Sequence, residues 1–231
     1  MRHTLRGNRI APAGACERGE DRPPVLLIHG YLATRGSLQL LERRLTDMGH
    51  LVLTYRLGLL HTGDISESAA LIARKIESIA AQTSLDRMDI VGHSMGGLVG
   101  LYYLKRLGGR RRVRRLIMLG TPTSGTWSAL LGVAVAPFGR ASLQLLPDSA
   151  FLRDLEQGSL PQGVEIISVA GDRDRVAPTS TTHLAGVRHI SVPTNHAGLL
   201  VDVEVAELVG EILRAPWPTQ PSALDTAAYR R

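Results

Sequence analysis

The sequence has a single cysteine and no long hydrophobic run. Cys16 is the only thiol in 231 residues, so an internal disulfide and a cysteine-based metal cluster are excluded. No apolar stretch approaches the roughly 18 residues that a membrane-spanning helix needs, and the first 24 residues lack the apolar region of a secretory signal. These absences predict a cytoplasmic protein, or a secreted one if the sequence is a trimmed mature form.

Charge is unevenly distributed along the chain. The formal net charge is +6, and seven lysines and arginines lie within residues 105–115, which leaves the rest of the chain near neutrality. No aromatic residues interleave with this cluster and no nucleic-acid-binding motif accompanies it, so we expect no nucleic-acid partner. The cluster follows an expected helix, whose carboxyl end favours cations, and we interpret it as a solvated helix end and turn. A patch that docks on an anionic surface is the alternative.

Short apolar runs alternate with helical patterns, and 44% of the residues are hydrophobic, enough for one domain with a sizeable core. Nearly continuous apolar runs are typical of strands buried on both faces of a parallel sheet. The six runs are residues 25–30, 51–57, 88–93, 116–120, 165–171 and 189–192. The sequence therefore predicts an α/β fold with a mostly parallel, doubly wound sheet of about six strands, flanked by helices.

The helical pattern is clearest after Asp64, where Glu67 has the spacing of a capping box and apolar residues follow at helical intervals. The strand–helix alternation fails between Thr123 and Gly163, where glycine, proline and apolar residues indicate short helices inserted over one edge of the sheet. The tail is polar and rich in proline, which predicts flexibility. The expected organisation is a partly ordered segment 1–24, a main domain 25–214 with the insertion 123–163, and a flexible tail 215–231.

The stretch "VGHSMGG", residues 91–97, stands between an expected strand and an expected helix. A sharp strand-to-helix turn strains the backbone of its central residue, Ser94, and requires small residues at two-residue offsets, where Gly92 and Gly96 stand. Ligands of open α/β sheets bind at the carboxyl ends of the strands, and a helix N-terminus stabilises negative charge. We predict that Ser94 is a nucleophile; an ordinary turn serine is the alternative.

A serine nucleophile needs a base, a carboxylate that orients the base, and donors for an oxyanion. In a nucleophile turn of this kind the acid follows the serine along the chain, and the histidine follows the acid. His196 lies in a loop after the last expected strand and is the predicted base. Asp172 and Asp174 both follow residues 165–171. We favour Asp174, which lies further into its loop, and keep Asp172 as the alternative.

The oxyanion donors are expected to be two backbone N–H groups. One belongs to Met95, directly after the nucleophile, and the other to Tyr31, after the tight turn that Gly30 allows. Two further histidines, His29 and His93, precede the serine and are interpreted as structural. We expect neither a metal nor an organic cofactor.

Five stretches together resemble one known family: "VLLIHGYLAT", "DIVGHSMGG", "LGTPTSGT", "GDRDRVAP" and "NHAG". They are similar to motifs of the α/β-hydrolase superfamily, in particular of bacterial triacylglycerol lipases and carboxylesterases, over residues 25 to about 213. The resemblance implies an α/β-hydrolase fold and a Ser94–His196–Asp174 triad that cleaves carboxylic esters through an acyl-enzyme. Thr123 stands where many lipases have histidine, which leaves the subfamily open.

The insertion carries the candidate substrate contacts. Its apolar residues either line an acyl pocket or small lid over the active site, or simply pack on the core. They are Trp127, Leu130, Leu131, Val135 and Phe138. The expected partner is a small-molecule or lipid ester, with transient contact at a lipid interface. The same triad also serves thioesterases, amidases and acyltransferases, and a non-catalytic binding module is the more distant alternative.

Overall fold

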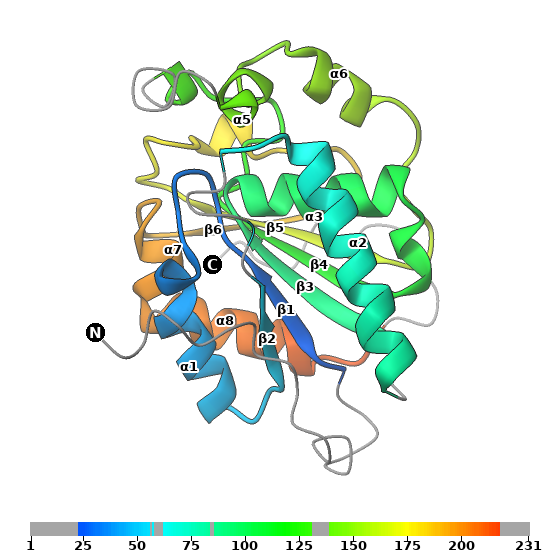
Figure 1. Ribbon diagram of the computed structural model, residues 1–231. Coiled ribbons are helices and arrows are strands. Elements are labelled where there is room, and N and C mark those ends of the chain that lie inside the picture. The colour runs from blue at the N-terminus through cyan, green and yellow to red at the C-terminus, as the bar shows by residue number, and fades with distance from the viewer. Residues whose placement is uncertain (1–22, 56, 58–61, 84–85, 131–138, 218–231) are drawn as a thin grey trace, which may run out of the picture.

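A computed structural model describes residues 23–55, 57, 62–83, 86–130 and 139–217. Six strands form one parallel sheet in the order β2-β1-β3-β4-β5-β6 (Figure 1). The strands are β1 Val25–Ile28, β2 Val52–Thr54, β3 Met88–His93, β4 Val113–Leu119, β5 Glu165–Gly171 and β6 Arg188–Val192. This confirms the predicted parallel, doubly wound sheet. The N-terminal segment before residue 23, the tail after residue 217 and the candidate residues Leu131, Val135 and Phe138 lie outside the described residues.

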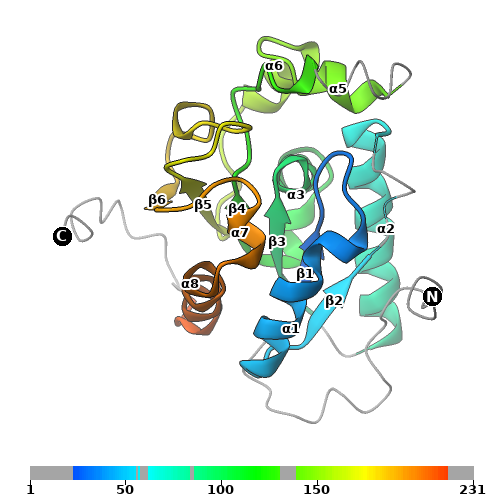
Figure 2. The same ribbon diagram turned by 90° about the vertical axis from the view of Figure 1, so that its left-hand side faces the viewer.

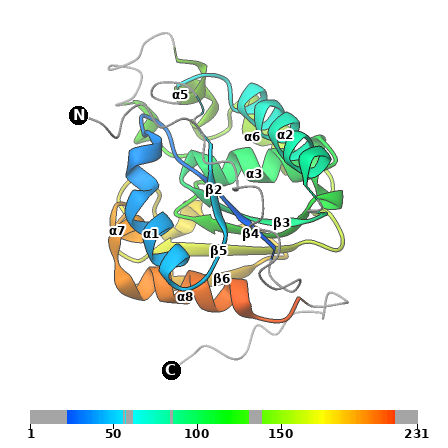
Figure 3. The same cartoon turned by 60° about the horizontal axis from the view of Figure 1, so that its bottom comes forward.

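Helices cover both faces of the sheet. Helices α1, α7 and α8 lie against one face, and α2 and α3 lie against the other (Figures 2 and 3). The bounds are α1 Gln39–Asp47, α2 Ile65–Gln82, α3 Met95–Arg106, α5 Arg140–Gln144, α6 Ala150–Glu156, α7 Gly198–Val201 and α8 Val203–Arg214. Among the described residues, no helix is both long and apolar enough to cross a membrane.

The alternating direction of side chains along each strand explains why apolar residues cover both faces of the sheet. On β1, Val25 and Leu27 pack with α1 and α8, whereas Leu26 and Ile28 pack with α2 and α3. Successive side chains of a strand point to opposite faces, so a strand covered on both sides reads as a continuous apolar run. This is the pattern from which the sheet was predicted.

The insertion is attached to the amino end of α2. The Asp64 carboxylate caps α2 by accepting N–H bonds from Ser66 at 2.8 Å and Glu67 at 3.3 Å. The side chain of Gln144, at the end of α5, accepts the N–H of Ile65 at 2.8 Å. Helices α5 and α6 thereby lie over one edge of the sheet (Figure 2), as the sequence predicted.

The structure corrects the interpretation of the basic cluster. Strand β4 begins at Val113, so Arg114 and Arg115 belong to the sheet rather than to a solvated turn. Arg114 pairs with buried Asp89 at 2.6 Å, and Arg115, fully buried, pairs with Glu165. Buried charges need such partners. Two arginines were therefore misread as surface residues because their carboxylate partners stand on other strands.

The strand order reverses beside β1. From β1 the chain crosses to β2 on one side and then returns to β3 on the other. In open α/β sheets the crevice at such a reversal, outside the carboxyl ends of the strands, is where ligands bind. Gly30 follows β1 and Ser94 follows β3, so both lie at this point.

Candidate active site

Ser94 occupies the turn between β3 and α3 in a strained conformation. Its φ is 55° and its ψ is −126°, a region that costs a non-glycine residue on the order of 1–3 kcal/mol. Three hydrogen bonds hold the residue there. Its N–H donates to the carbonyl of Leu119 at 2.8 Å, and its own carbonyl accepts from Gly97 N and from the Thr121 hydroxyl, both at 3.0 Å.

The flanking glycines leave no room for side chains. A Cβ on Gly92 would lie 2.5 Å from the backbone nitrogen of Gly97, and one on Gly96 would collide with the carbonyl oxygen of Ile28. A Cβ on Gly30 would lie 2.9 Å from that of Ser94. The loop after β1 therefore passes directly beside the serine, which is possible only without a side chain at position 30.

His196 and Asp174 meet at the same edge of the sheet. The Nδ1 atom of His196 lies 2.6 Å from Oδ2 of Asp174. The other carboxylate oxygen, Oδ1, accepts the N–H groups of Val176 and Ala177, each at 2.8 Å. The Asp174 side chain is fully buried, whereas 17% of the His196 side chain is exposed. The buried carboxylate therefore orients the imidazole, part of which is accessible to solvent.

The charge state of Asp174 follows from these contacts. Burial on its own raises the pKa of the carboxyl, but the hydrogen bonds from His196 and from the N–H groups of Ala177 and Val176 outweigh it, and the pKa lies below its ordinary value. Asp174 is thus a carboxylate at neutral pH. Asp172 has a half-exposed side chain and pairs with exposed Arg173 at 3.5 Å, so Asp174 is the aspartate that contacts His196.

Two consecutive residues at the end of β4, Leu119 and Gly120, lie between the serine and the His196–Asp174 pair. The carbonyl of Leu119 accepts the Ser94 N–H at 2.8 Å. A Cβ on the next residue, Gly120, would come within 3.1 Å of His196 Nδ1 and 3.0 Å of Asp174 Oδ2. Ser94 therefore contacts Leu119, the last residue of β4, and the His196–Asp174 pair lies beside the next residue, Gly120.

The two candidate oxyanion donors flank Ser94. Met95 is the first residue of α3 and is fully buried; N–H groups in the first turn of a helix have no partner within the helix. Tyr31 follows Gly30, whose Cα lies beside the serine. His29 is buried, and its Nδ1 lies 3.2 Å from the carbonyl of Gly30. Burial lowers the pKa of His29, which is consistent with a structural, uncharged histidine.

The candidate substrate residues that the structure describes lie on the surface. Trp127 is 69% exposed and Leu130 is 50% exposed. They are joined to the loop of Asp174, because the hydroxyl of Thr126 donates to the carbonyl of Val176 and the hydroxyl of Ser128 donates to that of Arg175. These two residues do not pack on the core, which was the alternative.

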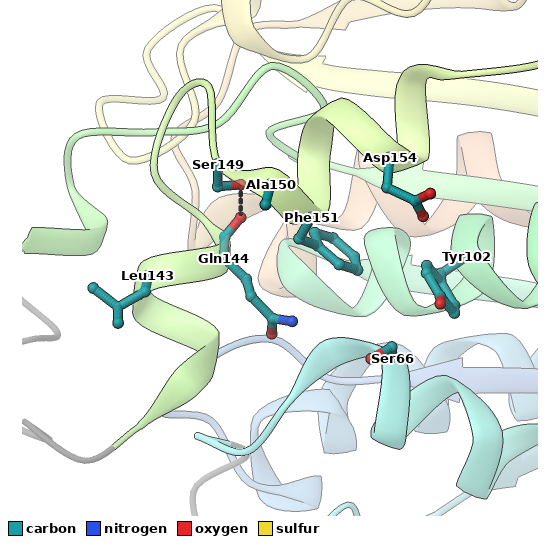
Figure 4. A pocket seen from close by; sticks show the side chains of 8 residues that line it. All are labelled: Ser66, Tyr102, Leu143, Gln144, Ser149, Ala150, Phe151 and Asp154. Carbon is teal, nitrogen blue, oxygen red and sulfur yellow. Dashed lines mark hydrogen bonds between the residues drawn. The ribbon is translucent and has the colours of Figure 1, made fainter.

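A cavity of about 400 Å³ lies elsewhere, between α2, α3, α5 and α6 (Figure 4). The rings of Tyr102 and Phe151 stack within it, with centroids 5.6 Å apart. Sequence reasoning missed this cavity because its walls come from four separated segments. Of the candidate substrate residues, the two that the structure describes, Trp127 and Leu130, do not line it. The lining residues are Ser66, Tyr102, Leu143, Gln144, Ser149, Ala150, Phe151 and Asp154.

Within the described ranges, no three histidine, cysteine or acidic side chains come together as a metal site would require. The end of β4 instead lies next to a strained serine at Leu119 and next to a hydrogen-bonded histidine and aspartate at Gly120. Such an arrangement can perform proton transfer and nucleophilic attack.

Comparison with known proteins agrees with this fold. A family profile described as alpha/beta hydrolase fold matches residues 23–149, more than half of the chain. The mature lipase BlEst2 of Bacillus licheniformis superposes with a TM-score of 0.72 at 15% identity, over 84% of this chain and 93% of that one. Lipase B of Aspergillus fumigatus superposes with a TM-score of 0.72 at 20% identity, over 88% of this chain but only 55% of the lipase chain. A monoacylglycerol lipase of Paleococcus ferrophilus superposes with a TM-score of 0.60 at 14% identity, over 83% of this chain and 95% of that one.

Proposed function

Because the chain belongs to the alpha/beta hydrolase fold family, we propose that it is a serine hydrolase that cleaves carboxylic esters with apolar acyl groups. Ser94 is the nucleophile, His196 the base and Asp174 the acid. The observation that carries the proposal is the 2.6 Å contact between His196 and buried Asp174, beside a serine held at positive φ.

The proposed reaction has two halves. In the first, His196 Nε2 takes the proton of Ser94 Oγ while that oxygen attacks the ester carbonyl, and the N–H groups of Met95 and Tyr31 stabilise the tetrahedral oxyanion. The imidazolium then protonates the leaving alcohol, and an acyl-enzyme remains. In the second half, water loses a proton to His196 and attacks the acyl group. The imidazolium then returns that proton to Ser94 Oγ as the bond between Oγ and the acyl carbon breaks, which releases the acid and restores Ser94. Asp174 stays ionised and stabilises the imidazolium throughout.

Exposed apolar residues near the site support an apolar substrate. Trp127, Leu130 and Val176 lie on the insertion and on the acid loop, and each is at least 41% exposed. Large exposed hydrophobic side chains that gather in one area mark interaction sites. We include in the proposal a lipid ester as substrate and a transient contact of these residues with its interface. The lipases among the structural neighbours support the same substrate class by analogy.

Two measurements on three proteins test the proposal. The wild type should hydrolyse p-nitrophenyl butyrate and react with a fluorophosphonate probe. Ser94→Ala should lose both activities, with a fall in kcat of at least about 10³-fold. Ser191→Ala, which removes an exposed hydroxyl on β6, is the matched control and should behave as wild type. Equal rates in all three proteins would refute the mechanism.

Thioesterase, amidase and acyltransferase activities use the same machinery, because the acyl-enzyme intermediate is common to them. A panel of ester, thioester and amide substrates, with water or an added alcohol as acceptor, distinguishes them. A wild-type protein that neither turns over any of these substrates nor labels with the probe would instead be a non-catalytic binding module.

A further inference from the structure

His93 joins the serine turn to the histidine loop. It is the last residue of β3 and directly precedes Ser94, and its side chain is buried. Its Nε2 lies 3.0 Å from the backbone oxygen of His196. The two imidazole rings also pack together, with centroids 4.6 Å apart and planes at 48°. One side chain thus contacts both the main chain and the ring of the proposed base.

We propose that His93 is a positioning residue, whose neutral imidazole fixes the loop of His196 relative to Ser94 by donating a hydrogen bond to the His196 carbonyl. This inference rests on the proposed function, because it assigns His93 a role in placing that base.

The contact determines which nitrogen of His93 carries the proton. A carbonyl oxygen can only accept, so Nε2 must be the donor. Nδ1 then keeps its lone pair, and this buried atom has no hydrogen-bond partner among the described residues. A second proton on the ring would therefore point into surroundings that offer it no acceptor.

Burial is the main reason why His93 stays neutral. The titratable groups that act on it are His196, Asp174 and His29. Burial, together with the nearby His196, lowers the pKa of His93 to about 3, against the opposing effects of the hydrogen bond to the His196 carbonyl and of Asp174. A cation at position 93 would oppose the positive charge that His196 must acquire during catalysis. Of the three imidazoles at this edge, His196 alone is left to take up the serine proton.

Several hydrogen bonds hold the loop of His196, among them the bond from the N–H of Gly198 to the side chain of Asn195 at 2.9 Å. Thr194 accepts the N–H of Arg173 at 3.0 Å, and its hydroxyl bonds to the carboxylate of Asp202. At residue 196 itself the backbone is fixed by the bond from His93. Reacting groups that move by about 1 Å can lose on the order of 10² in rate, so this one bond matters for the placement of the base.

Two substitutions separate the hydrogen bond from the packing. His93→Phe keeps a ring against His196 but removes the donor, whereas the side-chain amide of His93→Gln can donate to the same carbonyl. With kcat normalised to titrated active sites, we expect His93→Phe to lose about 10- to 100-fold in kcat with KM nearly unchanged. We expect His93→Gln to stay within a few-fold of wild type. Wild-type kcat in His93→Phe, or an equal loss in both variants, would overturn the proposal.

A readout that needs no activity completes the test. Nitrogen-15 NMR of histidine-labelled wild-type protein should show His93 as the neutral Nε2–H tautomer from about pH 5 to pH 8, where an ordinary histidine titrates. Titration of His93 in that range, or a proton on Nδ1, would refute the inference. A wild type that hydrolyses no ester refutes the proposed function, while the NMR result still decides the tautomer of His93.

Discussion

Replacing Asp174 by asparagine exchanges one carboxylate oxygen of the site for an NH2 group. The Oδ1 atom, which accepts the N–H groups of Val176 and Ala177 at 2.8 Å, is retained in the amide. The Oδ2 atom, 2.6 Å from His196 Nδ1, becomes an NH2 group that donates. Two donors cannot face each other, so the imidazole must place its proton on Nε2. In that tautomer it cannot accept the proton of Ser94.

The size of the effect distinguishes this tautomer change from the loss of a contact. One hydrogen bond to a charged group contributes about 1.5–3 kcal/mol, which corresponds to a rate loss of roughly 10- to 160-fold. The wrong tautomer, in contrast, removes the base, and we expect kcat to fall by about 10³- to 10⁴-fold, or about 4–5.5 kcal/mol. The fold should persist because the bonds that hold Asp174 in its loop are kept.

The assay is hydrolysis of p-nitrophenyl butyrate at neutral pH, with circular dichroism to verify folding. Asp172→Asn is the matched control, since Asp172 is half-exposed and pairs with Arg173 rather than with His196; its kcat should stay within about two-fold of wild type. If Asp174→Asn kept more than a tenth of the wild-type kcat, or if Asp172→Asn lost as much as Asp174→Asn, the assignment of the acid would be wrong.

Three further predictions concern stability. Gly96→Ala should destabilise the fold by about 1–3 kcal/mol and reduce esterase activity, because its Cβ meets a backbone carbonyl of β1. Urea unfolding measures this against Gly63→Ala, where no atom of the described residues would lie within 4 Å of the added Cβ, and equal midpoints would contradict it. Arg115→Ala should lower the free energy of unfolding by about 2–5 kcal/mol in the same assay, since it removes a fully buried side chain together with its pair to Glu165 and its bonds to two backbone carbonyls. Arg110→Ala, at an exposed residue, should change little; similar effects of the two would refute a structural role for Arg115. Acid should also destabilise the protein through His93: its pKa is 6.5 when unfolded and about 3 when folded, so the unfolded state binds the extra proton and the free energy of unfolding falls by about 1.4 kcal/mol per pH unit from pH 6.5 down to about 3. His93→Gln should lower that slope, and an unchanged slope would argue against a neutral buried His93.

The sheet was predictable because each strand is a short, mostly apolar run of residues in the sequence. The runs at residues 88–93 and 165–171 coincide with β3 and β5, since each strand is covered on both faces and is therefore mostly apolar. Strand β4 was predicted to begin at residue 116 and begins at Val113. Arginines are read as surface residues unless their buried partners are known, and those partners, Asp89 and Glu165, stand on neighbouring strands.

In the site, too, local features were predictable from the sequence and contacts between distant segments were not. The turn of Ser94 is a local feature, so the pattern of glycines around it was sufficient to predict the turn. The contact of Asp174 with His196 depends on the path of a loop, so the sequence favoured Asp174 over Asp172 without deciding between them. The bond from His93 to the His196 carbonyl joins segments far apart in the chain, and no local pattern indicates it.

The proposed hydrolysis depends most on the activation of Ser94 by His196. Peptide mapping by mass spectrometry after reaction with a fluorophosphonate tests it directly, on the wild type and on His196→Asn. We predict a single adduct, on Ser94, whose rate of formation falls by at least about 10³-fold in the variant. An adduct on another residue, or the same rate of labelling with and without the imidazole, would contradict the proposed enzyme.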